Sequence, residues 1–272
     1  MTALTEQELV SISKLIKERY GINLEKKSSL VESRLGLYLE SRGFSSYAEY
    51  FDFVCNDPTD NEMSDLINRL TTNHTYFMRE SDHFEYLIDE IIPWVETLTS
   101  NRDLRIWCAG CSSGEEPYGL SIYLLDYLAM REPAKSFDSV VLASDVSEKV
   151  LYEASTGIYS ADNLAALSEK HLEKYFTPVD KDHYKVTPQL RANVAFRKTN
   201  LTETFFVKSP LHAIFCRNVM IYFDNETKTA LVDKFYDTLI PGGYLLIGHS
   251  ESLMTFKHRF EYVKPSIYRK PL

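Results

Sequence analysis

The chain lacks any long apolar segment: none of its 272 residues falls in an apolar run of 18, and it does not open on an apolar stretch. A transmembrane helix needs roughly 20 predominantly apolar residues, and a secretory signal needs an apolar core near the N-terminus. We therefore expect a cytoplasmic protein with no signal peptide and no membrane insertion.

Cysteine is scarce, with only Cys55, Cys108, Cys111 and Cys216. Cys108 and Cys111 form a lone C-x-x-C, and no second pair at metal-binding spacing accompanies them, so we expect no metal site. A redox role for the pair is a weak alternative to the simpler view that small residues suit a strand end and a tight loop. This sparse cysteine usage fits a reducing cytoplasm.

Positive charge is in deficit, with 30 Lys and Arg against 39 Asp and Glu, a net charge of −9 and a pI near 5.3. An acidic field repels nucleic acid, so we expect no nucleic-acid partner unless a local basic patch opposes it. The 44% of apolar residues allows a full core, and the length allows one large domain or two unequal ones.

Residues 1–70 show helical periodicity and no strand pattern. Thr5 and Glu8 have the spacing of a capping box, and Gly21 ends the helix that follows. Three more helices are expected at about 28–41, 46–54 and 61–70. These elements predict a small all-helical N-terminal domain.

Beyond residue 100 the pattern changes to short apolar runs that alternate with helical stretches. The apolar runs lie at 104–110, 139–145, 193–201, 211–218 and 242–250, and the helical stretches at about 114–130 and 226–239. Buried strands that alternate with helices predict an α/β domain over 101–272, with a mostly parallel sheet covered on both faces. The last run, 260–270, could pair antiparallel at the edge of the sheet. Residues 155–192 break the alternation and predict a small inserted subdomain with a helix and a hairpin.

The segment 104–128 is the most informative part of the chain, because it predicts a strand, a loop of small residues and a helix. Gly110 and Gly114 have no Cβ, so the loop can turn sharply and approach a ligand closely. The loop lacks the first glycine of G-x-G-x-x-G and the Lys-Ser/Thr of a phosphate loop. Glu115 and Glu116, at the start of the helix, would also repel a pyrophosphate. The loop therefore predicts a cofactor other than a dinucleotide.

Asp145 ends the second strand of the α/β region, 31 residues after Gly114. A carboxylate at this position can accept both ribose hydroxyls of an adenosine ligand. Its alternative role is to cap the helix that begins near Ser147. Together with the loop at 110–116, Asp145 favours an adenosine cofactor without phosphates. S-adenosylmethionine (SAM) has this character, since it offers a ribose diol, an ammonium, a carboxylate and a sulfonium.

Other polar residues follow further strands of the predicted sheet. Arg217, Asn218 and Tyr222 follow one strand, and Asn200 and Leu201 follow another. Ligands of open α/β sheets bind outside the carboxyl ends of the strands, so these residues point to the same edge as Asp145. Tyr222 could equally pack in the core. His249, after the last parallel strand, suggests a general base, although a lone histidine is more often structural.

Residues 71–100 join the two domains, and we expect them to be a linker with a polar start. Its first ten residues are TTNHTYFMRE, from Thr71 to Glu80. Domain junctions often hold ligands, and Arg79 could form a bidentate pair with a carboxylate. The alternative is an ordinary surface arginine beside Glu80.

Together these segments resemble the chemotaxis receptor methyltransferase family, CheR, over essentially the whole chain. The motifs are TTNHTYFMRE at 71–80, RIWCAGCSSGEEPYGLSI at 105–122, ASDVSEKVLYEASTGIY at 143–159, TNL at 199–201, FCRNVMIYFD at 215–224 and PGGYLLIGHSESL at 241–253. The resemblance implies an N-terminal helical domain, a class I Rossmann-like methyltransferase domain and an inserted β-subdomain.

The resemblance also implies roles for individual residues. The polar start of the segment 71–100 matches the part of the family that closes over SAM. Arg79 and Tyr222 match residues implicated in catalysis. The matches to cofactor contacts are Asn73, Thr75, Arg79, Gly110, Glu115, Glu116, Asp145, Asn200, Leu201, Arg217 and Asn218. Which of the two adjacent glutamates faces the cofactor is left open.

The implied reaction is methyl transfer from SAM to glutamates of methyl-accepting chemoreceptors, with S-adenosylhomocysteine (SAH) as the second product. A glutamate is ionised near pH 7, so its oxygen can attack without a general base. The enzyme mainly has to align oxygen, methyl carbon and sulfur. We expect Arg79 to orient a carboxylate and Tyr222 to line the transfer site, which leaves His249 without a proton-transfer role.

One feature departs from family members that tether to a receptor's C-terminal tail, which carry a longer, glycine-containing hairpin. Here the segment 175–186 is short and has no glycine. We therefore expect recognition of the receptor's helical methylation region by a monomeric enzyme. Lys27 and Arg34 share a helix face that could meet an acidic receptor surface or could simply be solvated.

Two other function classes remain to be compared with this one. A SAM-binding regulatory scaffold without turnover would keep the cofactor residues, but the presence of Arg79 and Tyr222 argues against it. A nicotinamide-dependent dehydrogenase is disfavoured by the missing glycine pattern and by Glu115 and Glu116.

Overall fold

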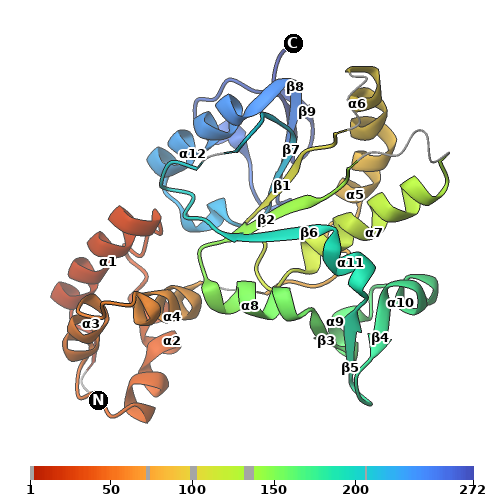
Figure 1. Ribbon diagram of the computed structural model, residues 1–272. Helices are drawn as coiled ribbons and strands as arrows, with labels where there is room; N and C mark the ends of the chain where they lie inside the picture. Colours follow the sequence, from red (N-terminus) through yellow and green to blue (C-terminus); the bar gives the residue numbers. More distant parts are fainter. Residues whose placement is uncertain (1–2, 72–73, 99–102, 132–137, 206) are drawn as a thin grey trace.

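The computed structural model describes residues 3–71, 74–98, 103–131, 138–205 and 207–272 (Figure 1). Four helices form the N-terminal domain: α1 (Glu6–Tyr20), α2 (Ser28–Ser41), α3 (Tyr47–Cys55) and α4 (Asn61–Leu70). They enclose a core of their own, with Ile16, Val31, Leu35 and Tyr50 fully buried. The expected helices and their ends are confirmed within a residue or two.

The first helix begins at a complete capping box. The Thr5 hydroxyl accepts from the backbone N–H of Glu8, and the Glu8 carboxylate accepts from the backbone N–H of Thr5. Two of the N–H groups at the start of the helix are satisfied in this way. Gly21 ends the helix in the left-handed conformation at φ +72°.

A seven-stranded sheet with the order β6-β2-β1-β7-β8-β10-β9 forms the larger domain. Its strands are β1 (Ile106–Ala109), β2 (Val141–Asp145), β6 (Val194–Lys198), β7 (Leu211–Cys216), β8 (Leu239–Ile247), β9 (Glu261–Lys264) and β10 (Ile267–Arg269). The first five of these pair in parallel, and β10 pairs antiparallel with β8 and with β9. The predicted parallel sheet with an antiparallel edge is confirmed, and the final run supplies a hairpin instead of a single strand.

Both faces of this sheet are buried, as predicted. On β1, Ile106 and Cys108 pack into the core on the side of helix α7 (Glu115–Ala129), whereas Trp107 and Ala109 pack into a second core with α12 (Asn225–Thr238). Successive side chains of a strand point to opposite faces, so a strand buried on both sides is apolar throughout.

The segment 71–100, predicted to be a linker, also contains a helix that the sequence analysis did not anticipate. Its consecutive parts are α5 (Asp82–Tyr86), the π-helical turn η1 (Leu87–Ile91) and α6 (Ile92–Leu98). Phe84, Leu87 and Ile91 are buried in the same core as α7. This helix therefore belongs to the layer that covers the sheet.

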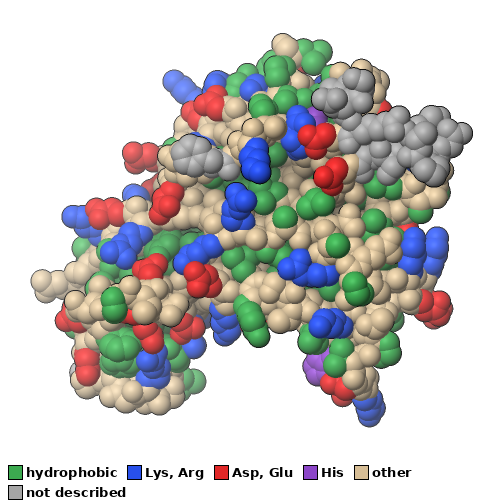
Figure 2. Space-filling model, in the orientation of Figure 1, with side chains coloured by type: hydrophobic (Ala, Val, Ile, Leu, Met, Phe, Trp, Pro, Cys, Tyr) green, Lys and Arg blue, Asp and Glu red, His purple; other side chains and the backbone are tan. Residues whose placement is uncertain are grey.

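The predicted insertion forms a small subdomain, which projects away from the sheet in Figures 1 and 2. It follows α8 (Glu148–Thr156) and contains β3 (Ile158–Ser160), α9 (Ala161–Leu164), α10 (Glu169–Tyr175), β4 (Phe176–Pro178), β5 (His183–Val186) and α11 (Pro188–Ala192). The strands form a separate antiparallel sheet in the order β3-β5-β4. The predicted hairpin is β4–β5, and β3 adds a third strand.

The two domains meet where α1 ends. The Asn23 N–H donates to the Tyr222 carbonyl at 2.8 Å, and Ile22 forms an isolated bridge with Phe223. A Cβ on Gly21 would lie 2.6 Å from Thr227 Cγ2, closer than carbon atoms approach. Gly21 therefore both ends α1 and lets the two domains approach each other. None of the helices in the described ranges is long and apolar enough to span a membrane.

Candidate functional site

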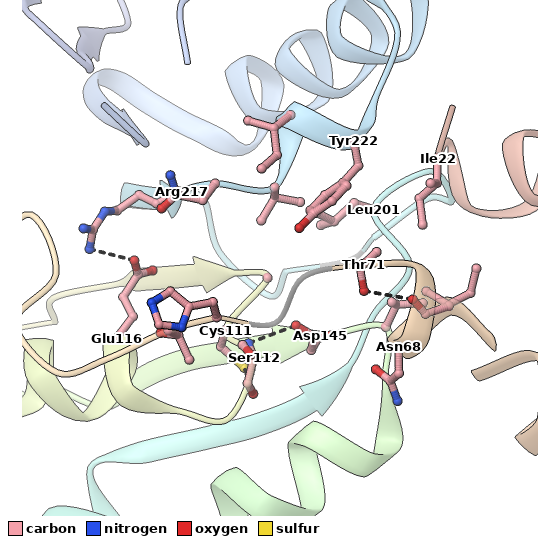
Figure 3. A pocket seen from close by; sticks show the side chains of 18 of the residues that line it. Ile22, Asn68, Thr71, Cys111, Ser112, Glu116, Asp145, Leu201, Arg217 and Tyr222 are labelled. Carbon is pink, nitrogen blue, oxygen red and sulfur yellow. Dashed lines mark hydrogen bonds and ion pairs between the residues drawn. The ribbon is translucent and has the colours of Figure 1, made fainter. Parts of the chain in front are cut away.

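A cavity of about 290 Å³ lies at the carboxyl ends of the parallel strands (Figure 3). The segments that follow β1, β2, β6 and β7 contribute Gly110, Cys111, Ser112, Asp145, Val146, Thr199, Asn200, Leu201, Arg217, Asn218, Val219, Ile221, Tyr222 and Phe223. Glu116 reaches it from the start of α7. The predicted convergence of strand ends at one edge of the sheet is confirmed.

The loop after β1 is fixed by hydrogen bonds to the end of β2. The N–H groups of Gly110 and Cys111 both donate to the Ser144 carbonyl, at 2.8 and 2.9 Å. Gly110 has φ +87°, and a Cβ there would lie 2.3 Å from Val219 Cγ2. Only glycine allows this turn to sit so close to the segment after β7.

Asp145 lies at the end of β2 and lines the cavity, but it is not the residue that caps α8. Its carboxylate accepts from the Ser112 N–H at 2.9 Å and from the Ser147 N–H at 3.0 Å, so it joins the loop after β1 to the turn before α8. Ser147 itself caps α8. A carboxylate has about four acceptor positions, so acceptor capacity remains beyond these backbone donors. Burial raises the pKa of Asp145 above its ordinary value.

The adjacent glutamates have different surroundings. Glu116 lines the cavity, whereas Glu115 is buried and is not among the described residues that line it. The Glu115 carboxylate accepts from the Ser113 hydroxyl at 2.8 Å, and burial raises its pKa. The structure therefore brings Glu116, and not Glu115, to the candidate cofactor site.

Arg217 forms the electrostatic centre of the cavity wall, with a side chain that is 2% exposed. Its guanidinium donates to Glu116 at 2.7 Å, to Glu80 at 3.1 Å and to the Arg79 carbonyl. Burial alone would raise the pKa of Glu80, but the Arg217 charge and the hydrogen bonds from Arg217 and the His249 backbone together outweigh it, and the pKa is lowered. One buried cation thus holds the segment 79–80 against α7. From the sequence, Glu80 was expected only as a neighbour of Arg79, and its ion pair with Arg217 was not predicted.

Asn218 adopts a left-handed backbone conformation at φ +60°. The half-buried carboxylate of Glu251 holds the turn by accepting from the N–H groups of Asn218, Gly248 and Ile221, at 2.9, 2.7 and 3.2 Å. Glu251 is a second residue that the sequence analysis did not assign. The sequence feature that could have indicated Glu251 is its position in the segment after β8, two residues from His249.

Asn200 and Leu201 line the cavity beside the helical domain. The Asn200 side chain donates to the Arg19 carbonyl at 2.7 Å and accepts from the Thr202 N–H at 3.1 Å. Leu201 is buried. In this structure the Asn200 amide therefore joins the strand-end loop to the end of α1.

The segment after α4 brings Thr75 and Arg79 to the cavity, while the predicted contact Asn73 lies outside the described residues. Arg79 donates to the His74 carbonyl at 2.9 Å, and its Nε lies 4.0 Å from a Glu80 carboxylate oxygen. An arginine has five N–H donors, so further donors remain for a carboxylate.

Tyr222 extends into the cavity from the short 3₁₀ turn η3 (Met220–Tyr222), opposite Asp145 (Figure 3). Its ring also packs against the core of the helical domain. Tyr222 therefore both packs against a core, as one interpretation suggested, and lines the cavity, as the other suggested.

A second wall of the cavity comes from the helical domain and was not predicted. It consists of Tyr20, Ile22, Ile67, Asn68 and Thr71, at the ends of α1 and α4. These residues have no pattern that sets them apart from the core of a helical domain. The sequence signals beside them are Gly21, which ends α1, and the polar motif that begins at Thr71.

The cysteines do not support a redox function. All are free thiols, and burial raises the pKa of Cys108, Cys111 and Cys216 well above the ordinary value. A thiol needs its thiolate form to react. Cys108 instead donates to Glu116 at 2.8 Å.

The residues present fit SAM better than a phosphate-bearing cofactor. Asp145 offers acceptors for hydroxyls, and the carboxylate of Glu116 faces the cavity where a phosphate would be repelled. Leu201, Val146 and Phe223 add apolar surface. Arg217 and Glu116 lie at one end of the cavity and Ile22 at the other (Figure 3), so a ligand can have differently charged ends.

Comparison with known proteins supports the same conclusion. Residues 73–269 match the family described as "CheR methyltransferase, SAM binding domain", and residues 7–71 match "CheR methyltransferase, all-alpha domain". A chemotaxis protein methyltransferase of Borreliella burgdorferi is 42% identical over 98% of this chain and 95% of its own length. The Escherichia coli chemotaxis protein methyltransferase is 35% identical over 98% of this chain and 91% of its own. The chain belongs to the CheR family of SAM-dependent methyltransferases.

Proposed function

We propose that this protein methylates glutamate side chains of chemoreceptors with SAM, forming glutamate methyl esters and SAH in chemotactic adaptation. The observation that supports this most directly is the single cavity that holds Asp145, Arg79 and Tyr222. Relatives that match nearly the whole chain are named chemotaxis protein methyltransferases.

The cofactor would be held mainly by the strand-end wall. Asp145 would accept the ribose hydroxyls, and Glu116 and Arg217 would meet the charged amino-acid part. Thr75, Gly110, Asn200, Leu201 and Asn218 would complete its contacts, with Asn73 as a further expected contact. When bound, SAM supplies a methyl group on a sulfonium, which is an excellent leaving group.

Arg79 would orient the acceptor. A glutamate carboxylate is already ionised near pH 7, so the reaction needs alignment more than proton removal. The Arg79 side chain is 29% exposed and lines the cavity, so a carboxylate that arrives from solvent can reach it. Its remaining N–H donors can hold one carboxylate oxygen and leave the other to attack.

Tyr222 would line the transfer site. Its carbonyl is held by the Asn23 N–H, so the helical domain fixes the position of the turn that carries the ring. The electron-rich face of an aromatic ring attracts a cation such as a sulfonium. Tyr222 would also exclude water from the reacting atoms.

The receptor would be recognised through its helical methylation region and not through a C-terminal tail peptide. A tail that added a strand to the β-subdomain would need a long free edge. Here the edge strand β4 has three residues and ends at Pro178, which has no N–H to donate. On α2, Arg34 is exposed and Lys27 half-buried, so this helix could meet an acidic receptor surface. We further propose a monomeric, cytoplasmic enzyme.

The test is to incubate the protein with labelled SAM and membranes that hold candidate receptors, and then to map base-labile methyl esters. Esters on glutamates of the methylation region are expected. Arg79→Ala and Tyr222→Leu should lose transfer but remain folded, while the surface controls Arg259→Ala and Tyr152→Leu should keep it. Turnover at the wild-type rate in the Arg79 and Tyr222 variants would contradict the catalytic roles assigned to these two residues.

The alternative function is a regulatory scaffold that binds SAM without turnover. SAM binding with no methyl transfer to any receptor glutamate would favour that alternative. Binding of a receptor tail peptide at micromolar strength would contradict the proposed mode of recognition.

A further inference from the structure

A cluster of potential metal ligands lies behind the Arg217 wall of the cavity. Glu80 precedes α5, His83 lies within it, and His249 follows β8. One donor atom from each lies within 4.8 Å of the others. Two segments that are distant in the sequence thus bring two imidazoles and a carboxylate together.

His83 is the most unusual member of this cluster. It is completely buried, and within the described part of the chain neither ring nitrogen has a hydrogen-bond partner. A buried polar group without a partner costs roughly 1–3 kcal/mol, so such groups usually have a role. The ring faces the cluster, because Nδ1 lies 3.9 Å from Glu80 Oε2 and the His249 ring centroid is 5.0 Å away.

His249 provides access from solvent. Its side chain is 48% exposed, and Nε2 lies 3.2 Å from Asp82 Oδ1, whose own side chain is 49% exposed. Histidines that bind metals commonly pair their second nitrogen with a carboxylate. Asp82 is placed either for that pairing or for direct ligation, and an ion can enter between these two exposed groups.

The local charge also suits a cation. The carboxylates of Glu80, Asp82 and Glu116 outnumber the guanidinium groups of Arg79 and Arg217. Arg217 stays 3.1 Å from Glu80 Oε2, while Glu80 Oε1 is 4.0 Å from Arg79 Nε. Oε1 is thus the Glu80 oxygen with the more distant positive neighbour.

We propose that Glu80, His83 and His249 form a binding site for a divalent transition-metal ion, with Asp82 as a fourth ligand or as the partner of His249. Two imidazoles and one carboxylate suit zinc and its neighbours, and they offer too few oxygens for calcium or magnesium. Zinc–nitrogen bonds are about 2.0–2.1 Å long, so the donor atoms must close by roughly 1 Å when an ion binds. This site is separate from the cysteines that the sequence analysis excluded as metal ligands.

The test is cobalt and zinc binding to the full chain without a polyhistidine tag, after treatment with a chelator. Cobalt should give the visible absorption of a nitrogen–oxygen site at one ion per chain, and zinc should displace it. His249→Ala should weaken binding at least tenfold. Because His249 is half-exposed, this variant should remain folded, and circular dichroism checks that it does.

The matched control is His183→Ala. His183 is also 48% exposed, and it also pairs with a half-exposed aspartate, with Nδ1 2.9 Å from Asp180 Oδ1. Binding should be unchanged in this variant. A second test, His83→Gln, should also weaken binding, which ties the site to the buried histidine.

Three results would overturn the proposal. They are the absence of cobalt binding to the wild-type chain, equal loss in His183→Ala and His249→Ala, and a sulfur-to-cobalt charge-transfer band that would place the ion on cysteine. None of these readouts depends on methyl transfer, so they are independent of the proposed function.

Discussion

Two walls of the candidate cofactor cavity differ in origin. One consists of loops at the carboxyl ends of parallel strands and holds Asp145, Arg217 and Asn218. The other consists of the ends of α1 and α4 and holds mainly Ile22, Ile67 and other residues of a helical domain. The first wall contains most of the charge, whereas the second closes the cavity with packing surface.

The two walls depend on different features of the fold. Parallel strands bring their carboxyl ends to one edge whatever the details of packing, so polar residues at those ends converge. The helical wall depends on how two domains dock, through contacts such as the Asn23 N–H with the Tyr222 carbonyl. Variants in the first wall should therefore affect ligand chemistry, and variants in the second should affect docking.

The largest effect is expected for Arg217→Met, in the strand-end wall. The change leaves the partly buried Glu80 and Glu116 without their shared cation, and breaking a fully buried ion pair typically costs about 3–5 kcal/mol, which is the upper limit here. Urea unfolding should show this loss, and calorimetry should show strongly weakened SAH binding. Arg259→Met, at an exposed ion pair, serves as the control. Equal stability of the two variants would contradict the central role of Arg217.

The next largest effect is expected for Gly21→Ala, in the helical wall. Alanine in the left-handed region costs roughly 1–2 kcal/mol, and its Cβ would also collide with Thr227 Cγ2 at 2.6 Å. Gly43→Ala is the matched control, since Gly43 has φ +81° and no atom of the described residues lies within 4 Å of an added Cβ. Only Gly21→Ala should weaken SAH binding as well as stability. Identical behaviour of the two would show that docking does not shape the cavity.

A smaller and pH-dependent effect is expected at Asp145. Its carboxylate must be ionised to accept ribose hydroxyls, and burial raises its pKa, so SAH affinity should begin to fall at a higher pH than for an ordinary aspartate. The raised pKa also means that the folded protein binds this proton more tightly than the unfolded chain. The contribution of Asp145 to stability is therefore lost as pH rises through the folded pKa.

The measurement is SAH affinity against pH for the wild type and Asp145→Asn. The variant should bind more weakly at neutral pH and should lose the part of the pH dependence that belongs to this carboxylate. Parallel pH profiles for the two proteins would contradict the assignment of Asp145 to the ribose.

The smallest effect is expected for Asp224→Asn, at the domain junction. Asp224 lies 2.7 Å from Lys17 and caps α12, and asparagine can keep the cap while it removes the ion pair. Burial alone would raise the pKa of Asp224, but Lys17 and the cap lower it to about 2. The difference in stability between the wild type and Asp224→Asn should be present above about pH 4. It should be lost as pH falls through about 2, because Asp224 then becomes protonated in the folded protein as well as in the unfolded chain. A stability difference that persists at pH 2 would show that the substitution weakens the cap of α12.

The sequence predicted the parts of this molecule that depend on local pattern. The capping box at Thr5, the alternation of strands and helices and the position of Asp145 all follow from periodicity and strand ends. It could not separate Glu115 from Glu116, since the direction of each side chain depends on how α7 packs.

Features that depend on tertiary packing were missed. The helix at 82–98 begins with polar residues that suggested a linker, and only its contact with the sheet shows that it belongs to the core. Glu80 and Glu251 act by pairing with groups more than 30 residues away. The helical wall of the cavity likewise forms only when the two domains dock.

The most direct test of this two-walled site is a crystal structure of the protein with SAH. Our account predicts SAH in the cavity with its ribose hydroxyls on Asp145, its amino-acid part near Arg217 and Glu116, and Ile22 or Ile67 in contact with it. SAH bound elsewhere, or bound without contact to either wall, would contradict the account.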